Sequence, residues 1–138
     1  MTLVIDASIT MAWCFEDEST EHSEAVLELV AGAGALVPSL WRLEVTNVLA
    51  VAERKRRLTE AQSSRFVSLL AQLPIDTVVD VPPMPELMEL VRRHGLSSYD
   101  ATYLWLSATR GLPLATLDER LADASHEAGV EVVGSREN

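Results

Sequence analysis

Short apolar runs alternate along the chain with longer stretches in which apolar residues recur at helical spacing. The runs are rich in Val, Ile and Leu, and most of them end at an aspartate, a proline or a glycine, as buried strands do. They predict five strands, at residues 2–5, 35–37, 76–81, 114–116 and 130–133. The helical spacing between them predicts a short turn at 9–15 and helices at 22–31, 40–57, 59–73, 86–93, 99–110 and 118–127.

Capping and stop residues set the ends of these helices. Thr59 and Gln62 have the spacing of a capping box, and Ser97 or Ser98 can cap the helix that follows them. Gly95 and Gly111 are placed to end two others. Each predicted boundary therefore has a local chemical cause.

The helix at 40–57 has its own apolar side in this interpretation. Leu40, Leu43, Val48, Val51 and Ala52 are expected to face the core.

Strands that alternate with helices favour a parallel sheet covered on both faces. The sequence therefore predicts one α/β domain over residues 1–138, with three layers and a short, mainly parallel sheet of five strands flanked by helices. Hydrophobic residues make up 48% of the chain and aromatic residues only 5%, so the core is expected to be aliphatic.

Cysteine content and the N-terminus indicate the compartment. The single cysteine, Cys14, cannot form an internal disulfide, and the first apolar run ends at Asp6 without a preceding basic segment. The chain contains no apolar stretch of transmembrane length. We expect a cytoplasmic protein that does not enter a membrane.

Four acidic residues lie where such a fold collects its ligands. Asp6 follows the first strand, Glu44 lies early in the helix after the second, Asp100 lies in the first turn of its helix, and Asp118 follows the fourth strand. Ligands of open α/β sheets bind beyond the carboxyl ends of the strands. Each aspartate could instead only cap a helix or complement its dipole.

Glu44 is harder to explain as a surface residue. It has the helical spacing of Leu40, Val48 and Val51, so we expect it to point toward the core. A buried carboxylate is costly unless a cation, a hydrogen-bond donor or a second carboxyl group lies beside it.

Several carboxylates in one cleft would repel one another, and a hard divalent cation resolves that repulsion. Carboxylate oxygens are the ligands that Mg²⁺ and Mn²⁺ prefer. Such a cation can activate water and stabilise charge on a phosphate, which indicates phosphodiester hydrolysis. A structural metal, or a metal with another role, stays open from the spacing alone.

Four segments in order resemble the sequence blocks of PIN-domain ribonucleases, and most closely those of the VapC toxins of type II toxin–antitoxin systems. The likeness spans essentially the whole chain. The segments are 4–8 (VIDAS), 44–49 (EVTNVL), 98–103 (SYDATY) and 114–121 (LATLDERL).

The resemblance implies an endoribonuclease that depends on Mg²⁺ or Mn²⁺. Asp6 and Asp100 match the metal-binding aspartates of the family, and Glu44 matches a glutamate that helps to hold the metal or its water. Asp118 matches a fourth acid that binds the metal directly or through water. Three small polar residues match supporting positions: Ser8, Thr116 and Asn47.

The resemblance also implies partners. These are an RNA substrate, a VapB-like antitoxin, and a second copy of the chain in a homodimer, a heterotetramer or a larger complex. Structured transfer RNA or ribosomal RNA is the expected substrate, and messenger RNA stays open. A chain with net charge −10 suits a basic antitoxin segment. The basic run Arg54, Lys55, Arg56 and Arg57 could contact RNA phosphates, or it could simply be a solvated helix end.

Other nucleotide- and phosphate-handling folds fit less well. A response-regulator receiver needs paired acids after the first strand and a lysine near its end, and a haloacid-type phosphatase needs Asp-x-Asp where this chain has Ser8 in the second position. The main alternative is a protein with the same fold that does not catalyse hydrolysis. It is a catalytically silent PIN-like module that binds RNA or protein.

Overall fold

A parallel sheet of four strands forms the centre of the computed structural model, which describes residues 2–134. Its order is β3-β2-β1-β4, so β1 lies inside the sheet and is buried along its whole length. All three pairings are parallel, which requires a crossover between each pair of strands. The strands are β1 (Leu3–Ile5), β2 (Ala35–Pro38), β3 (Ile75–Val78) and β4 (Leu114–Ala115).

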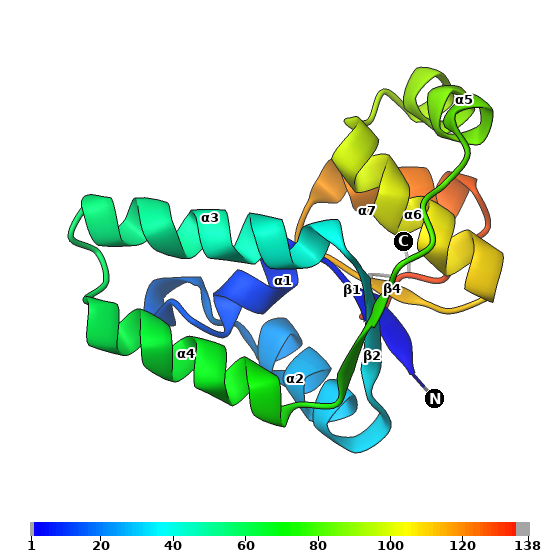
Figure 1. The fold of residues 1–138 in the computed structure, drawn as a ribbon. Helices are drawn as coiled ribbons and strands as arrows, with labels where there is room; N and C mark the ends of the chain where they lie inside the picture. Colours follow the sequence, from blue (N-terminus) through cyan, green and yellow to red (C-terminus); the bar gives the residue numbers. More distant parts are fainter. Residues whose placement is uncertain (1, 135–138) are drawn as a thin grey trace.

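Helices cover both faces of this sheet. Figure 1 shows α3 and α4 extending from one side as an antiparallel pair with α1 and α2 beside them, whereas α5, α6 and α7 gather on the other side. The predicted three-layer α/β arrangement is therefore confirmed. The helices are α1 (Ala7–Ala12), α2 (Glu21–Ala33), α3 (Leu40–Arg54), α4 (Glu60–Gln72), α5 (Met84–His94), α6 (Ser98–Arg110) and α7 (Glu119–Glu127), with a 3₁₀ turn at Glu16–Glu18.

The predicted caps are present. Thr59 and Gln62 form a reciprocal capping box at the start of α4. Ser97 caps α6 by accepting a hydrogen bond from a backbone N–H. Gly95 and Gly111 end α5 and α6 in the left-handed conformation, each with φ of 66°, which glycine adopts without the steric cost that a Cβ atom would add.

The prediction of a fifth strand at 130–133 is wrong. Within the described residues this segment makes one isolated bridge, between Val132 and Leu114. Two backbone hydrogen bonds hold it there, from the Leu114 N–H to the Glu131 carbonyl and from the Val133 N–H to the Leu114 carbonyl. The neighbouring strand β4 has only two residues, so it offers too short an edge for a ladder.

The face that helix α3 presents to the core matches the expected one only in part, since Ala52 is buried and Leu40 packs against the core as expected. Leu43 is 73% exposed, and Val48 is also exposed. Instead, the indole of Trp41 enters the core and donates a hydrogen bond to Thr10 Oγ1 at 3.0 Å. The buried residues of this helix are Trp41, Val45, Leu49 and Ala52.

Several element ends also differ. The helix predicted at 40–57 ends at Arg54, and the strand predicted at 76–81 occupies Ile75–Val78. The core itself is largely aliphatic, as expected. Among residues 2–134, no helix is both long enough and apolar enough to cross a bilayer.

Candidate active site

Asp6 stands at the end of the central strand and caps the helix that follows. Its Oδ1 accepts hydrogen bonds from the Ile9 backbone N–H at 3.1 Å and from Ser8 Oγ at 2.7 Å. Its Oδ2 accepts a hydrogen bond from the Thr116 hydroxyl. The residue is only 4% exposed. Both carboxylate oxygens are thus fixed in direction at the C-terminal edge of the sheet.

Two hydroxyl groups join Asp6 to the segment after β4. Ser8 Oγ lies 3.3 Å from Thr116 Oγ1 and accepts the Leu117 backbone N–H at 2.9 Å. Thr116 Oγ1 in turn accepts the Asp118 backbone N–H at 3.0 Å. This network holds the loop that contains Asp118 against Asp6, although the two residues lie far apart in the sequence.

Asp100 and Asp118 both stand at the starts of helices. The Asp100 backbone N–H donates to Ser97 Oγ at 3.0 Å, which places Asp100 in the first turn of α6. Asp118 precedes α7 and accepts the Leu121 backbone N–H on Oδ1 at 3.1 Å. The cap role foreseen for Asp118 is therefore real, and its second oxygen is not used by the cap.

Glu44 is half-buried and has a specific partner. The hydroxyl of Tyr103 donates a hydrogen bond to Glu44 Oε1 at 2.7 Å. Tyr103 is 1% exposed and lies three residues after Asp100, so both side chains belong to one face of α6. Burial, together with Glu44, raises the pKa of this hydroxyl, which therefore keeps its proton and remains a donor.

The carboxyl groups influence one another electrostatically. Burial raises the pKa of Asp6 to about 6, against the lowering by its hydrogen bonds, and Asp100 adds a small upward contribution. Burial also raises the pKa of Glu44, and Asp100 again contributes. The pKa of Asp100 is raised by burial and then by Asp118, while Arg120 opposes the rise. Asp100 is thus electrostatically linked to the other three acids.

The fold therefore brings the four acids predicted from the sequence into one region, which we call the acidic site: Asp6, Glu44, Asp100 and Asp118. Ser8 and Thr116 support it, since both bind Asp6. Asn47 is exposed on α3. We find no hydrogen bond that joins it to the acidic site within the described residues.

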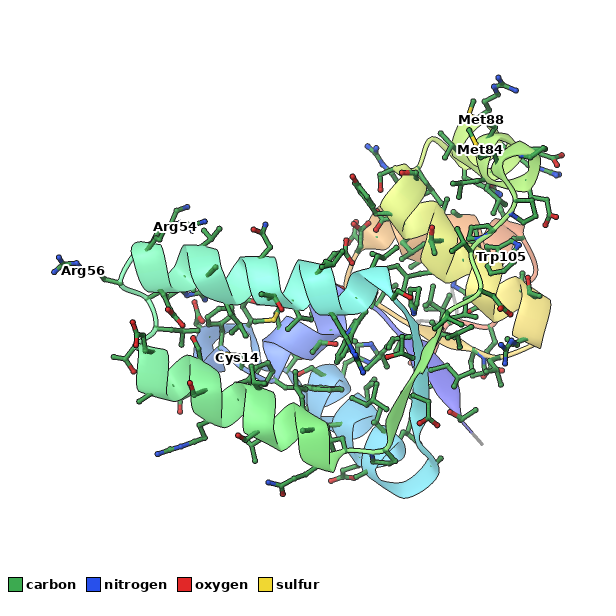
Figure 2. The ribbon with its side chains drawn as sticks, in the orientation of Figure 1. Cys14, Arg54, Arg56, Met84, Met88 and Trp105 are labelled. Carbon is green, nitrogen blue, oxygen red and sulfur yellow. The ribbon has the colours of Figure 1, made fainter. Side chains whose placement is uncertain are left out.

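The basic run lies away from the acidic site. Figure 2 shows Arg54 and Arg56 projecting from the end of α3 that is farthest from the sheet. Arg57 bonds to Asp17 at 2.7 Å and to Glu18 at 3.2 Å, and its guanidinium lies over the ring of Phe15. Arg57 is thus already engaged by the protein, whereas Arg54 and Arg56 extend into solvent.

Tyr103 is the residue of the site that the sequence analysis missed. Its partner Glu44 is 59 positions away, so no local pattern shows the contact. One signal was present: a tyrosine three residues after a candidate catalytic aspartate shares its helical face. A buried tyrosine at that place must find an acceptor for its hydroxyl.

The donor chemistry of the acidic site fits a hard divalent cation. Its side chains offer only oxygen ligands, and Ser8 and Thr116 orient the carboxylate of Asp6 as outer partners commonly do. Within residues 2–134, however, no three Asp, Glu, His or Cys side chains stand close enough together to hold a metal ion. The acids therefore form a loose group that a cation would have to draw together.

Comparison with known proteins identifies the family. The family model of the PIN domain matches residues 3–127, which is most of the chain. The chain belongs to the PIN domain family. Among curated PIN-domain relatives, Ribonuclease VapC3 of Pyrobaculum aerophilum is 30% identical over 127 residues, covering 89% of this chain and 94% of the relative. Ribonuclease VapC1 of Mycobacterium tuberculosis is 32% identical over 124 residues, covering 78% of this chain and 91% of the relative.

A solved structure agrees with the PIN fold. The crystal structure of PAE2754 from Pyrobaculum aerophilum superposes with a TM-score of 0.72 and covers 91% of this chain and 85% of that protein. Its sequence identity is 23%, so the likeness concerns the fold alone. The resemblance to PIN-domain ribonucleases of the VapC type is confirmed.

Proposed function

We propose that this PIN-domain protein is a metal-dependent endoribonuclease that acts as the toxin of a toxin–antitoxin pair. The observation that carries the proposal is the convergence of four acids from separate segments on the C-terminal edge of the sheet, with the pKa of the buried Asp6 raised to about 6. Carboxyl groups that are gathered at one edge of a sheet, with pKa values raised by burial and by one another, indicate a functional site. The ribonuclease names of the two relatives support RNA as the substrate.

The residues of the site would divide the work of phosphodiester hydrolysis. Asp6, Asp100 and Asp118 would hold Mg²⁺ or Mn²⁺, which supplies positive charge to stabilise the reacting phosphate. Glu44 would orient the attacking water and accept its proton, because burial raises the pKa of a carboxyl group toward the range of a general base. Tyr103 would hold Glu44 in place through its 2.7 Å hydrogen bond. Ser8 and Thr116 would fix the direction of Asp6.

The substrate would be a structured RNA, with transfer RNA and ribosomal RNA as the first candidates. Arg54, Lys55 and Arg56 are exposed and would contact its phosphates at a distance from the reacting bond. A VapB-like antitoxin would neutralise the enzyme by placing a basic segment among the acids. The net charge of −10 and the raised pKa values of Asp6 and Asp100 both favour a cationic partner there.

The test is cleavage of a structured RNA pool by the purified chain, free of antitoxin. We expect cleavage with Mg²⁺ or Mn²⁺, none with EDTA, and none from Asp6→Asn or Asp100→Asn. Circular dichroism should show both variants to be folded. Asp76→Asn serves as the control, because Asp76 is exposed on the edge strand β3 and lies outside the acidic site.

Two results would contradict the proposal. Full activity of either acidic-site variant would remove that residue from the mechanism. A folded chain that binds Mn²⁺ and RNA, yet cleaves no member of the pool, would favour the alternative of a silent binding module.

A further inference from the structure

A second concave feature adjoins the acidic site. It is a pocket of about 430 Å³, a size within the range of small-molecule sites. Asp118 of the acidic site lines this pocket, and so does Thr116, which binds Asp6, so the two features adjoin directly. We call it the α7 pocket; it is lined by His22, Thr116, Leu117, Asp118, Glu119, Ala122, Asp123, His126, Val132, Val133 and Gly134.

The charge of this lining excludes a phosphate as its occupant. Asp118, Glu119 and Asp123 are acidic, and the described lining contains no lysine or arginine. A phosphate group would meet three carboxylates without a compensating cation. The lining therefore favours an occupant that carries hydrogen-bond donors and no negative charge.

The rest of the lining suits a flat, partly apolar group. Two imidazoles, His22 and His126, and the apolar side chains of Leu117 and Val132 provide contact surface. Proteins that recognise single-stranded RNA hold splayed bases against aromatic or imidazole rings and read their edges by hydrogen bonds. Carboxylates accept hydrogen bonds from exocyclic amino groups such as N4 of cytosine.

We propose that the α7 pocket is a nucleobase subsite, which binds a base next to the cleaved phosphate and prefers bases with an amino group over uracil. The proposal rests on the proposed function, because the acidic site must hold an RNA phosphate for the neighbouring base to reach the pocket. Cytosine and uracil form the sharpest comparison. They have the same ring size, and cytosine presents an amino donor where uracil presents a carbonyl acceptor, which the carboxylates would repel.

The first experiment measures binding without cleavage. Short oligomers of cytidine and of uridine are titrated with Mg²⁺ against the Asp100→Asn chain by fluorescence anisotropy, because this variant is expected not to cleave RNA and Asp100 does not line the α7 pocket. We expect the cytidine oligomer to bind about fivefold more tightly or better, the lower range for one specific base contact. Equal binding of the two oligomers would overturn the subsite.

Two variants test whether the preference for cytidine over uridine arises in the α7 pocket. Ala122→Phe fills the pocket, and Asp123→Ala removes one of its acceptors. Each should bring the ratio of cytidine to uridine binding close to one. The matched controls are Ala31→Phe on the exposed side of α2 and Asp76→Ala on β3, and neither should alter the ratio. An unchanged ratio in both pocket variants, with thermal melting that shows them folded, would overturn the proposal.

A second readout separates this proposal from the proposed function. A randomised single-stranded RNA library is cleaved by wild type and by Asp123→Ala, and the bases flanking each cut are counted. Depletion of uracil at one flanking position in wild type, flattened in the variant, supports the subsite. Base selectivity in the binding assay without any cleavage would retain the subsite and refute the nuclease. Cleavage with no base preference would retain the nuclease and refute the subsite.

Discussion

Burial of its carboxyl group is the main determinant of the pKa of Asp6. Its carboxyl group is 4% exposed, and its pKa of about 6 lies above the ordinary value of 3.8. The folded state therefore holds the proton more tightly than the unfolded chain does. Stability from this group is fully present below pH 3.8 and is lost as the pH rises through 6.

Asp6→Asn should consequently stabilise the metal-free protein at high pH. At pH 8 we expect a gain of roughly 2–3 kcal/mol in the free energy of unfolding, because the buried charge is gone. The gain should shrink by about 1 kcal/mol at pH 5, where the wild-type carboxyl is mostly protonated. Urea unfolding in EDTA at the two pH values measures both numbers. An equal gain at both would show that Asp6 titrates as an ordinary carboxyl group.

Substitution of Tyr103 tests whether its hydroxyl positions Glu44 for catalysis. Tyr103→Phe removes only the hydroxyl that donates to Glu44, so we expect kcat to fall by about tenfold or more while KM changes little, as for partners that orient a catalytic group. The control is Tyr99→Phe, which removes a hydroxyl from a side chain that is 62% exposed on the same helix. A rise in KM at unchanged kcat would assign Tyr103 to RNA binding instead.

Helices α4 and α6 begin with comparable side-chain caps, but only α6 carries a residue of the acidic site. Thr59 caps α4, which lies on the opposite side of the sheet from α6 (Figure 1). Ser97 caps α6 and holds the N–H of Asp100 itself.

Removing each cap should therefore separate stability from activity. Thr59→Ala and Ser97→Ala should each lower the free energy of unfolding by about 1 kcal/mol. Only Ser97→Ala should also reduce RNA cleavage, because the first turn of α6 contains Asp100. Urea unfolding and initial cleavage rates of the two variants provide the comparison. Equal losses of activity would mean that general stability, rather than the placement of Asp100, limits the rate.

Local chemistry is what made the elements predictable. The capping box at Thr59 and the glycines at 95 and 111 act over a few residues, and these boundaries are close to the structure. The strand at 130–133 was over-predicted because a strand depends on its neighbour, and β4 is too short to pair with it. The face of α3 was misjudged in part for a related reason, since the Trp41 hydrogen bond to Thr10 spans 31 residues.

In the acidic site, too, features set by nearby residues were predictable from the sequence, and contacts between distant residues were not. Asp6, Asp100 and Asp118 were foreseeable because each follows a strand or opens a helix. The partners that fix them were foreseeable only in part: Ser8 and Thr116 came from the family resemblance, and Tyr103 was missed. The α7 pocket was also invisible in the sequence, because its lining comes from α2, α7 and the segments around them.

Over the whole molecule, the basic end of α3 is separated from the acidic site. If it guides RNA, Arg56→Glu should weaken RNA binding more at low salt than at high salt and reduce the salt slope by about one. Filter binding across a salt series measures this effect. Arg65→Glu on α4 is the control for the same change of charge. An unchanged slope would identify residues 54–56 as a solvated helix end.

An apolar surface marks the opposite end of the molecule. Val79, Val81 and Met84 are each at least 75% exposed, and Met88 projects from the same end of α5 as Met84 (Figure 2). If these side chains pack against a second copy in the homodimer that the family resemblance implies, a charge placed among them should break that dimer. Light scattering should give a dimer for wild type and for Leu69→Glu, and a monomer for Met84→Glu. A wild-type monomer at micromolar concentration would refute the dimer.

The pairing of β1 with β4 also bears on how the protein is made. Asp6 leaves the ribosome 110 residues before its hydrogen-bonded partner Thr116, and β1 likewise precedes its partner strand β4. A nascent chain folds from its N-terminus as it lengthens. Here Asp6 cannot bind Thr116 until the chain has been synthesised past residue 116. A fragment that ends before residue 114 lacks both Thr116 and Asp118, so its acidic site is incomplete.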